Sequence, residues 1–213
     1  MEVLRATIRA MTASFRYPMF MVGYQPTYRV PPISTVYGLL SAAKGEKVYL
    51  QDLQIGYDFV AEGRGLDLER IHIYGDAKKT RPVTFQGTDV INREFLYNCT
   101  LTLYLTDMRF REYLKRPRYN LLLGRQSDLA WVEALDPVTL IEQESVEIQN
   151  TIVPFTGDIP GQVVSLPSDF TDEAERRPLR VMPYCIVDSP QTVSPGYLDP
   201  ERNVGVYLHD FRD

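Results

Sequence analysis

Residues 31–45 read PPISTVYGLLSAAKG, and they predict a helix whose two ends are both marked in the sequence. A proline pair precedes Ser34, a favoured N-cap residue, and Gly45 is a typical stop after the last turn. Apolar side chains recur between these signals at helical spacing, at positions 36, 39, 40 and 43. We therefore expect one face of this helix to pack on the core of the fold.

The segment before this helix is rich in arginine and tyrosine, and it includes Arg16, Tyr17 and Arg29. The first turn of a helix presents free backbone N–H groups and a partial positive charge, which suit phosphate oxygens. We predict that Ser34 and Thr35, at the helix start, form a phosphate seat together with these three side chains.

Alternating apolar and polar residues predict strands on either side of the helix. We expect strands at residues 3–11, 53–61, 68–74 and 95–106, a turn at Gly63 and Gly65, a short helix over residues 107–115, and extended segments at residues 121–123 and 129–135. The order is strand, helix, strand, strand, helix, strand. This order is typical of an α+β, ferredoxin-like fold, in which two helices cover one face of an antiparallel sheet. The uncovered face of such a sheet is a common RNA platform.

The composition changes beyond residue 141, where the helical signal nearly vanishes and eight of the 15 prolines lie. We expect residues 1–140 to form the ferredoxin-like domain and residues 141–213 to form a small β-rich lobe. The expected strands of this lobe are residues 146–153, 179–187 and 204–209, and residues 168–177 read as a charged loop.

Charge is spread unevenly along the chain, although the net charge is only −5. Residues 1–125 contain 18 Lys and Arg against 12 Asp and Glu, whereas residues 126–213 contain 5 against 16. Arginine outnumbers lysine 18 to 5, and its planar fork suits phosphate and base contacts. Solvated surface charge also produces such asymmetry, so the pattern alone does not establish nucleic-acid binding.

Side chains that transfer protons near neutral pH are scarce. His72 and His209 belong to predicted strands, and neither lies near a Cys, His or carboxylate at metal-ligand spacing. The sequence contains no nucleophile elbow, phosphate loop or dinucleotide loop. Cys99 and Cys185 are too few for a disulfide framework or a four-cysteine zinc site. We expect no catalytic residue, no metal and no cofactor.

The sequence also predicts where the protein resides. No apolar run approaches the roughly 20 residues that span a bilayer, and the chain begins with a strand pattern instead of a signal segment. We expect no membrane contact and a reduced, cytoplasmic setting.

Further basic residues lie outside the helix start. The polar insertion at about residues 75–92 contains Lys78, Lys79 and Arg81, Arg93 enters the long strand that follows, and Arg125 lies in a tight turn. Such groups at one end of a sheet bind the phosphates of a bent single-stranded RNA, while tyrosines stack on its bases. The alternative for each of them is an ordinary surface residue.

Three segments resemble the fifth family of CRISPR-associated proteins. Residues 32–45 resemble the first-helix motif of that family, residues 92–96 (NREFL) resemble the entry to its central strand, and residues 123–125 (LGR) resemble its Leu-Gly-Arg turn. The order and spacing match over about residues 1–140. The resemblance implies the RAMP-superfamily subunit that holds the 5′ handle of the crRNA in a type I Cascade complex, with a leaning toward subtype I-B.

The same resemblance implies a thumb and a set of partners. The hairpin insertion at about residues 75–92 would be the thumb that grips the handle. The implied partners are the crRNA, the Cascade backbone subunit and the Cascade large subunit, with target DNA only indirectly engaged, in antiviral defence. The positive portion would then face the handle, and the acidic lobe would dock to a protein.

One branch of that family cleaves precursor crRNA with a tyrosine, a lysine and a histidine adjacent to the lysine. In this chain Lys115 is followed by Arg116, and neither histidine has a lysine beside it. We therefore expect an RNA binder without catalytic activity. Two alternatives stay open at this point: a RAMP endoribonuclease that processes precursor crRNA, and an acidic protein–protein scaffold that binds no RNA.

Overall fold

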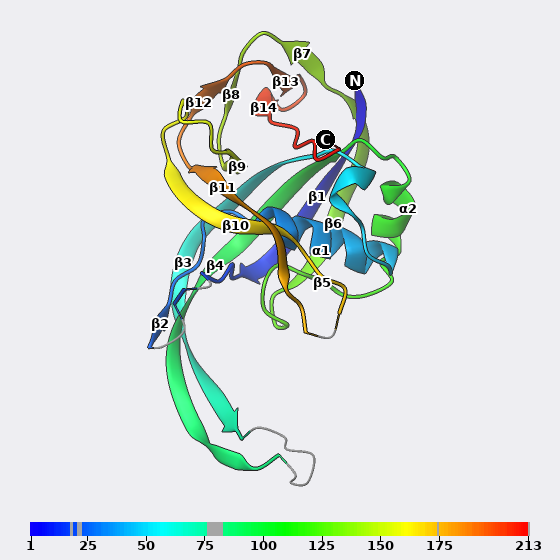
Figure 1. Cartoon of the computed structure of the whole chain (residues 1–213). Coiled ribbons are helices and arrows are strands. Elements are labelled where there is room, and N and C mark those ends of the chain that lie inside the picture. Colours follow the sequence, from blue (N-terminus) through cyan, green and yellow to red (C-terminus); the bar gives the residue numbers. More distant parts are fainter. Residues whose placement is uncertain (18, 21–22, 76–82, 174, 213) are drawn as a thin grey trace.

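A curled mixed sheet forms the centre of the protein (Figure 1). The computed structural model describes residues 1–213 except residues 18, 21–22, 76–82, 174 and 213. The strands of the sheet are β1 (Glu2–Ala13), β2 (Tyr24–Gln25), β3 (Ile55–Tyr74), β4 (Phe85–Leu105), β5 (Leu121–Leu122) and β6 (Leu129–Thr139). They lie in the order β2-β4-β1-β6-β5, and β3 also pairs with β4. All the pairs are antiparallel except that of β2 with β4.

One face of this sheet carries the main core. Every second side chain of β1 from Leu4 to Ala10 is at most 1% exposed, as the alternating pattern predicts. Helix α1 (Ile33–Lys44) packs its buried stripe on this core, and helix α2 (Phe110–Lys115) adds Phe110 and Leu114. The predicted apolar face of α1 is confirmed, since all four of its residues are buried.

The sequence predicted the C-terminal end of α1 correctly and its N-terminal end wrongly. Gly45 is the C-cap, as expected: it has a left-handed φ of 91° and its N–H donates to the Ser41 carbonyl at 2.8 Å. The N-cap prediction was wrong, because Pro32 occupies that position and no side chain caps the helix. The extended Pro32 backbone already aims its carbonyl at the N–H of Thr35, at 2.9 Å, so Ser34 lies inside the first turn.

Strands β3 and β4 form one long hairpin that extends away from the rest of the molecule (Figure 1). The predicted turn at Gly63 and Gly65 was wrong, because β3 runs unbroken through both. Each glycine lies opposite an aromatic residue of β4, and an added Cβ would come within 2.4 Å of the Tyr97 ring or 2.7 Å of the Phe95 ring. The glycines leave space for cross-strand rings. Strand β4 also begins ten residues earlier than the strand predicted at Phe95.

The last third of the chain is β-rich, as expected. Its strands are β7 (Ile141–Gln143), β8 (Val146–Ile148), β9 (Thr151–Pro154), β10 (Gln162–Phe170), β11 (Pro178–Val187), β12 (Gln191–Val193), β13 (Gly196–Asp199) and β14 (Val204–Val206). Several boundaries differ from the prediction, and β7, β10, β12 and β13 lie outside the expected strands. Asn150, with a φ of 56°, divides the strand expected at 146–153, β10 includes the first three residues of the expected loop at 168–177, and the last strand ends at Val206 instead of residue 209.

The main core includes side chains from both predicted domains. Ile152, Tyr184 and Phe211 belong to the same buried cluster as Leu4 and Leu101. The opposite face of the sheet is partly covered as well, because Tyr104 packs with Val206 in a separate small cluster. The division at residue 140 stays a prediction, and the packing across it is continuous.

Candidate nucleic-acid interface

Residues 14–29, here called the entry segment, connect β1 to α1 and contain three of the predicted RNA-binding residues. Glu94 of β4 holds this segment at two points. Its carboxylate accepts the N–H of Thr27 at 3.0 Å, and its carbonyl accepts the hydroxyl of Ser14, also at 3.0 Å. The N–H of Asn92 donates to the Gly23 carbonyl at 2.9 Å, where β2 pairs with β4. Residues 92–94 therefore anchor the entry segment.

The turn at Gly124 supports the start of the same segment. Gly124 has a φ of +118°, and an added Cβ would lie 2.0 Å from the Ser14 carbonyl oxygen. The N–H of Ser14 donates to the Leu123 carbonyl at 3.1 Å. Asp128 ties the turn to β1, since its carboxylate accepts a hydrogen bond from the hydroxyl of Thr12 at 2.6 Å. Only glycine combines this backbone conformation with such a close approach.

The end of the entry segment and the start of α1 are fixed by Tyr57 of β3. Its hydroxyl donates to the Pro31 carbonyl at 2.6 Å, and burial raises its pKa well above the ordinary value, so the hydroxyl stays a donor. The helix start, residues 92–94 and the Gly124 turn lie far apart in the sequence. Residues 92–94 and the Gly124 turn both contact the entry segment, and the helix start follows it in the chain.

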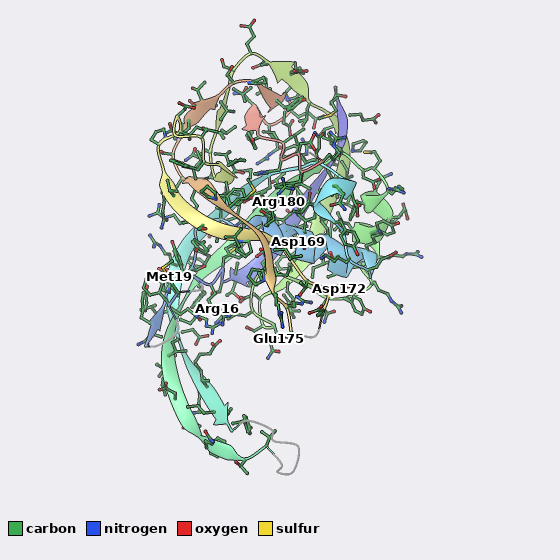
Figure 2. The ribbon with its side chains drawn as sticks, in the orientation of Figure 1. Arg16, Met19, Asp169, Asp172, Glu175 and Arg180 are labelled. Carbon is green, nitrogen blue, oxygen red and sulfur yellow. The ribbon has the colours of Figure 1, made fainter. Side chains whose placement is uncertain are left out.

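The entry segment presents Arg16 and Tyr17 in different ways. Arg16 pairs its backbone with Thr27, and its side chain is exposed and has no ion pair among the described residues. Figure 2 shows Arg16 on the side of the molecule from which the β3–β4 hairpin extends. Tyr17 stacks on Tyr28 with the ring centroids 3.6 Å apart, and its hydroxyl is hydrogen-bonded to Gln162.

The structure does not assemble the predicted phosphate seat into one contact cluster. Arg29 pairs with Asp188 at 2.8 Å, and Ser34 and Thr35 are half-buried in the first turn of α1. Ser34 lines a hollow of about 340 Å³ between α1 and the loop after β10. Among the described residues, no hydrogen bond or ion pair joins Arg16 or Arg29 to Ser34 or Thr35.

Two other predicted contacts, Arg93 and Arg125, are bound by carboxylates. Arg93 pairs with Glu69 at 2.9 Å, and Arg125 pairs with Asp128, Asp67 and Glu69. Burial alone would lower the pKa of Arg125, but Asp128 and the other carboxylates raise it, so the charge is retained. The guanidinium of Arg125 also lies over the Phe95 ring, 5.7 Å from its centroid. Their geometry is that of structural ion pairs.

The predicted contacts Lys78, Lys79 and Arg81 lie outside the described residues. The described part of the hairpin exposes apolar side chains on both strands, including Leu68, Tyr74 and Phe85. The sequence prediction passed over a second basic run, residues 109–118, which follows β4 and contains four arginines and a lysine. The density of basic residues in that run was the signal that could have marked it.

Proton-transfer groups are no better placed than the sequence predicted. His209 is buried between aromatic rings, and burial lowers its pKa to about 4. His72 lies on the hairpin beside Phe85, with the ring centroids 6.0 Å apart. Within the described ranges, no group of three His, Cys, Asp or Glu side chains is placed to hold a metal. No helix in the described part of the chain is long and apolar enough to cross a membrane.

Comparison with known proteins places these features in a family. The family model described as "CRISPR-associated protein (Cas_Cas5)" matches residues 3–193. A search of curated proteins gives no significant match.

Three solved structures share the fold. A chain of a "CRISPR RNA-guided surveillance complex" is 19% identical, with 95% of this chain and 91% of that chain covered and a TM-score of 0.55. A CRISPR protein from Archaeoglobus fulgidus is 9% identical, with 99% and 100% covered and a TM-score of 0.51. A chain of the type III-B Cmr-beta complex, bound to cognate target RNA and AMPPnP, is 13% identical, with 89% and 85% covered and a TM-score of 0.55.

Proposed function

The chain belongs to the Cas5 family of CRISPR-associated proteins, and from this premise we propose that it is the RNA-binding subunit that holds the 5′ handle of the crRNA in a type I surveillance complex. The observation that carries the proposal is the entry segment. Two of the family-like motifs, residues 92–96 and 123–125, hold this loop through hydrogen bonds and close packing, and the third, the helix start, follows it in the chain. The loop exposes Arg16, which has no ion pair among the described residues, and it contains the stacked Tyr17 and Tyr28. Such a loop suits a bent single strand.

We propose a ferredoxin-like arrangement for residues 1–140. The strand order β3-β4-β1-β6, with α1 and α2 packed on the same core, supports it. In this proposal the β3–β4 hairpin is the thumb that grips the handle. The described part of this hairpin extends beyond the insertion predicted at residues 75–92. The lean toward subtype I-B stays a prediction.

The proposal also includes the protein partners. We infer that the acidic lobe, residues 141–213, docks to a backbone or large subunit, because its carboxylates would repel RNA. The paired state of Arg93 and Arg125 supports a smaller RNA contact than the sequence predicted, centred on Arg16 and the hairpin. Target DNA would be engaged only through the crRNA.

Handle binding can be tested with the purified full-length chain. The probe is an RNA with the handle sequence of its own CRISPR repeat, and a scrambled RNA of equal length is the control. We expect Arg16→Gln with Arg29→Gln to weaken handle binding about tenfold and to reduce the log–log salt slope by about 0.7, the amount for one phosphate contact, because Arg29 is bound by Asp188. Arg109→Gln with Arg177→Gln is the matched control, since it removes the same charge from exposed, carboxylate-paired arginines. Equal binding of handle and scrambled RNA, or equal loss in both variants, would refute the proposal.

We propose that the subunit has no catalytic activity. The buried, neutral His209 and the isolated His72 support this view, because neither has a lysine or carboxylate partner among the described contacts. Incubation with precursor crRNA in the presence of a chelator tests it. Cleavage at one position of the repeat would contradict the proposal and favour the endoribonuclease alternative.

A further inference from the structure

The basic run after β4 lines a hollow at the edge of the main sheet, here called the edge hollow. Its volume is about 360 Å³, within the range of ligand pockets, and its walls come from the end of α2, the loop that follows, and β5 and β6. Strand β5 covers β6 only at Leu129 and Ala130. The part of β6 beyond these residues therefore borders the hollow.

Three cations project around this hollow without partners. Lys115 and Arg118 line it, and Arg116 lies between them in the chain. All three are exposed, and among the described residues none of their side chains has an ion pair or a hydrogen bond. Arg109, at the N-terminal end of α2, is bound by Asp107 at 2.8 Å. Arg111 of α2 is exposed and also has no ion pair among the described residues, so the unpaired charge runs from α2 into the loop that follows it.

Two exposed aromatic side chains complete the walls. Tyr119 is 60% exposed and Trp131 of β6 is 46% exposed. Large aromatic rings are usually buried in a folded protein. Two half-exposed rings between unpaired cations therefore point to a ligand with flat faces and negative charge. Single-stranded nucleic acid has both properties.

The edge hollow is separate from the entry segment. The N–H groups of Arg118 and Tyr119 donate to the carbonyls of Ala43 and Ala42, each at 3.0 Å, so the hollow lies at the C-terminal end of α1. The entry segment leads into the opposite end of this 12-residue helix. At 1.5 Å per residue the two ends are about 18 Å apart.

We propose that the edge hollow is a second nucleic-acid contact, which takes a single-stranded segment outside the crRNA handle. Lys115, Arg116 and Arg118 bind successive phosphates, and a base stacks on Trp131 or Tyr119. The site does not depend on the handle contact proposed above. An acidic protein segment is the competing occupant. It would pair with the three cations but would not stack on Trp131 or Tyr119.

Trp131 is the only tryptophan in the chain, so its fluorescence reports this site directly. The probe is a uridine oligonucleotide of about 12 nucleotides, within the range that one single-strand module covers. We expect saturable quenching by the oligonucleotide and none by polyglutamate of equal charge. Absence of quenching by the oligonucleotide, or equal quenching by both polymers, would overturn the proposal, the latter in favour of an acidic protein partner.

Variants separate the two sites. We expect Lys115→Gln with Arg116→Gln and Arg118→Gln to weaken oligonucleotide binding at least tenfold and to lower the salt slope by about 2. Arg109→Gln with Arg177→Gln and Arg212→Gln removes three charges from ion-paired arginines and should bind within about twofold of the parent. Trp131→Ala should weaken oligonucleotide binding about 30-fold, the middle of the stacking range, as measured by the anisotropy of a labelled oligonucleotide.

The handle variant keeps the two proposals distinguishable. Arg16→Gln with Arg29→Gln should leave the quenching of Trp131 unchanged, whether or not the handle contact exists. Thermal melts monitored by circular dichroism establish that each variant is folded, since all the altered residues of the hollow are exposed at the surface. If the triple variant and its matched control bind equally, the edge hollow is not a nucleic-acid site.

Discussion

Replacing Gly124 by alanine tests the claim that the turn and the entry segment are built against each other. The left-handed φ of +118° disfavours any residue with a Cβ, at a cost of about 1–2 kcal/mol. The new Cβ would also lie 2.0 Å from the Ser14 carbonyl oxygen, so the segment must move. This movement breaks the hydrogen bond from Ser14 to Leu123, which contributes about 1 kcal/mol.

The sum is a loss of about 2–3 kcal/mol in the free energy of unfolding, or a Tm about 4–12 °C lower for a chain of this length. Gly157→Ala is the matched control, because Gly157 has a φ of +94° and nothing lies within 4 Å of its added Cβ. It should cost only the backbone part, about 1–2 kcal/mol, a Tm decrease of about 2–8 °C. Thermal unfolding followed by circular dichroism measures both. Equal decreases would show that the close approach to Ser14 does not matter, and the argument for a shared site would fail.

Three further changes test other parts of the structure. Glu94→Ala should cost about 1–3 kcal/mol in urea unfolding and weaken handle binding, because the buried N–H of Thr27 loses its acceptor. Asp199→Asn should cost about 3 kcal/mol at neutral pH, because Arg5 loses a buried partner. His209→Phe should be neutral or stabilising at pH 7, since both ring nitrogens of the buried imidazole lack hydrogen-bond partners among the described residues.

The pH dependence of stability distinguishes the last two variants. Burial alone would raise the pKa of Asp199, but its hydrogen bonds, that from Arg5 first, lower it, so its stabilisation is full above the unfolded pKa of about 4 and is lost below it. The difference in free energy of unfolding between the parent and Asp199→Asn should therefore become smaller as the pH falls below about 4. Burial lowers the pKa of His209 to about 4, so the parent loses stability as the pH falls from about 6.5 to 4. His209→Phe should remove this loss of stability between pH of about 6.5 and 4. An unchanged dependence of stability on pH would contradict the assignment of that loss to His209.

Local patterns predicted the elements whose causes are local. The alternation in β1 and the stripe in α1 depend only on which faces are buried, so the sequence sufficed. The glycines at 63 and 65 could not be read in the same way, because their reason is a pair of rings 30 or more residues later in the chain. A glycine that makes a turn and a glycine that admits a ring look alike until the pairing is known.

The same limit applies to the predicted site. An arginine can bind phosphate when no carboxylate of the protein is paired with it. Residue type alone does not say whether such a partner is present. Arg93 and Arg125 have carboxylate partners on β3, which the chain brings together only after the hairpin has formed. Arg16 has none among the described residues, and it lies in the segment that residues 92–94 and the Gly124 turn hold in place.

The charge asymmetry of the chain is smaller in the folded protein than in the sequence. Arg5, from the positive portion, is bound by Asp199 and Glu201 of the acidic portion, while Arg202 of the acidic portion binds Asp58 of the positive one. These pairs cross the predicted domain boundary and neutralise charge that a count by segment assigns to external partners. What is left for a polyanion is the set of cations without internal partners. Affinity for RNA should therefore follow the removal of unpaired cations, and the net charge of a segment should predict it poorly.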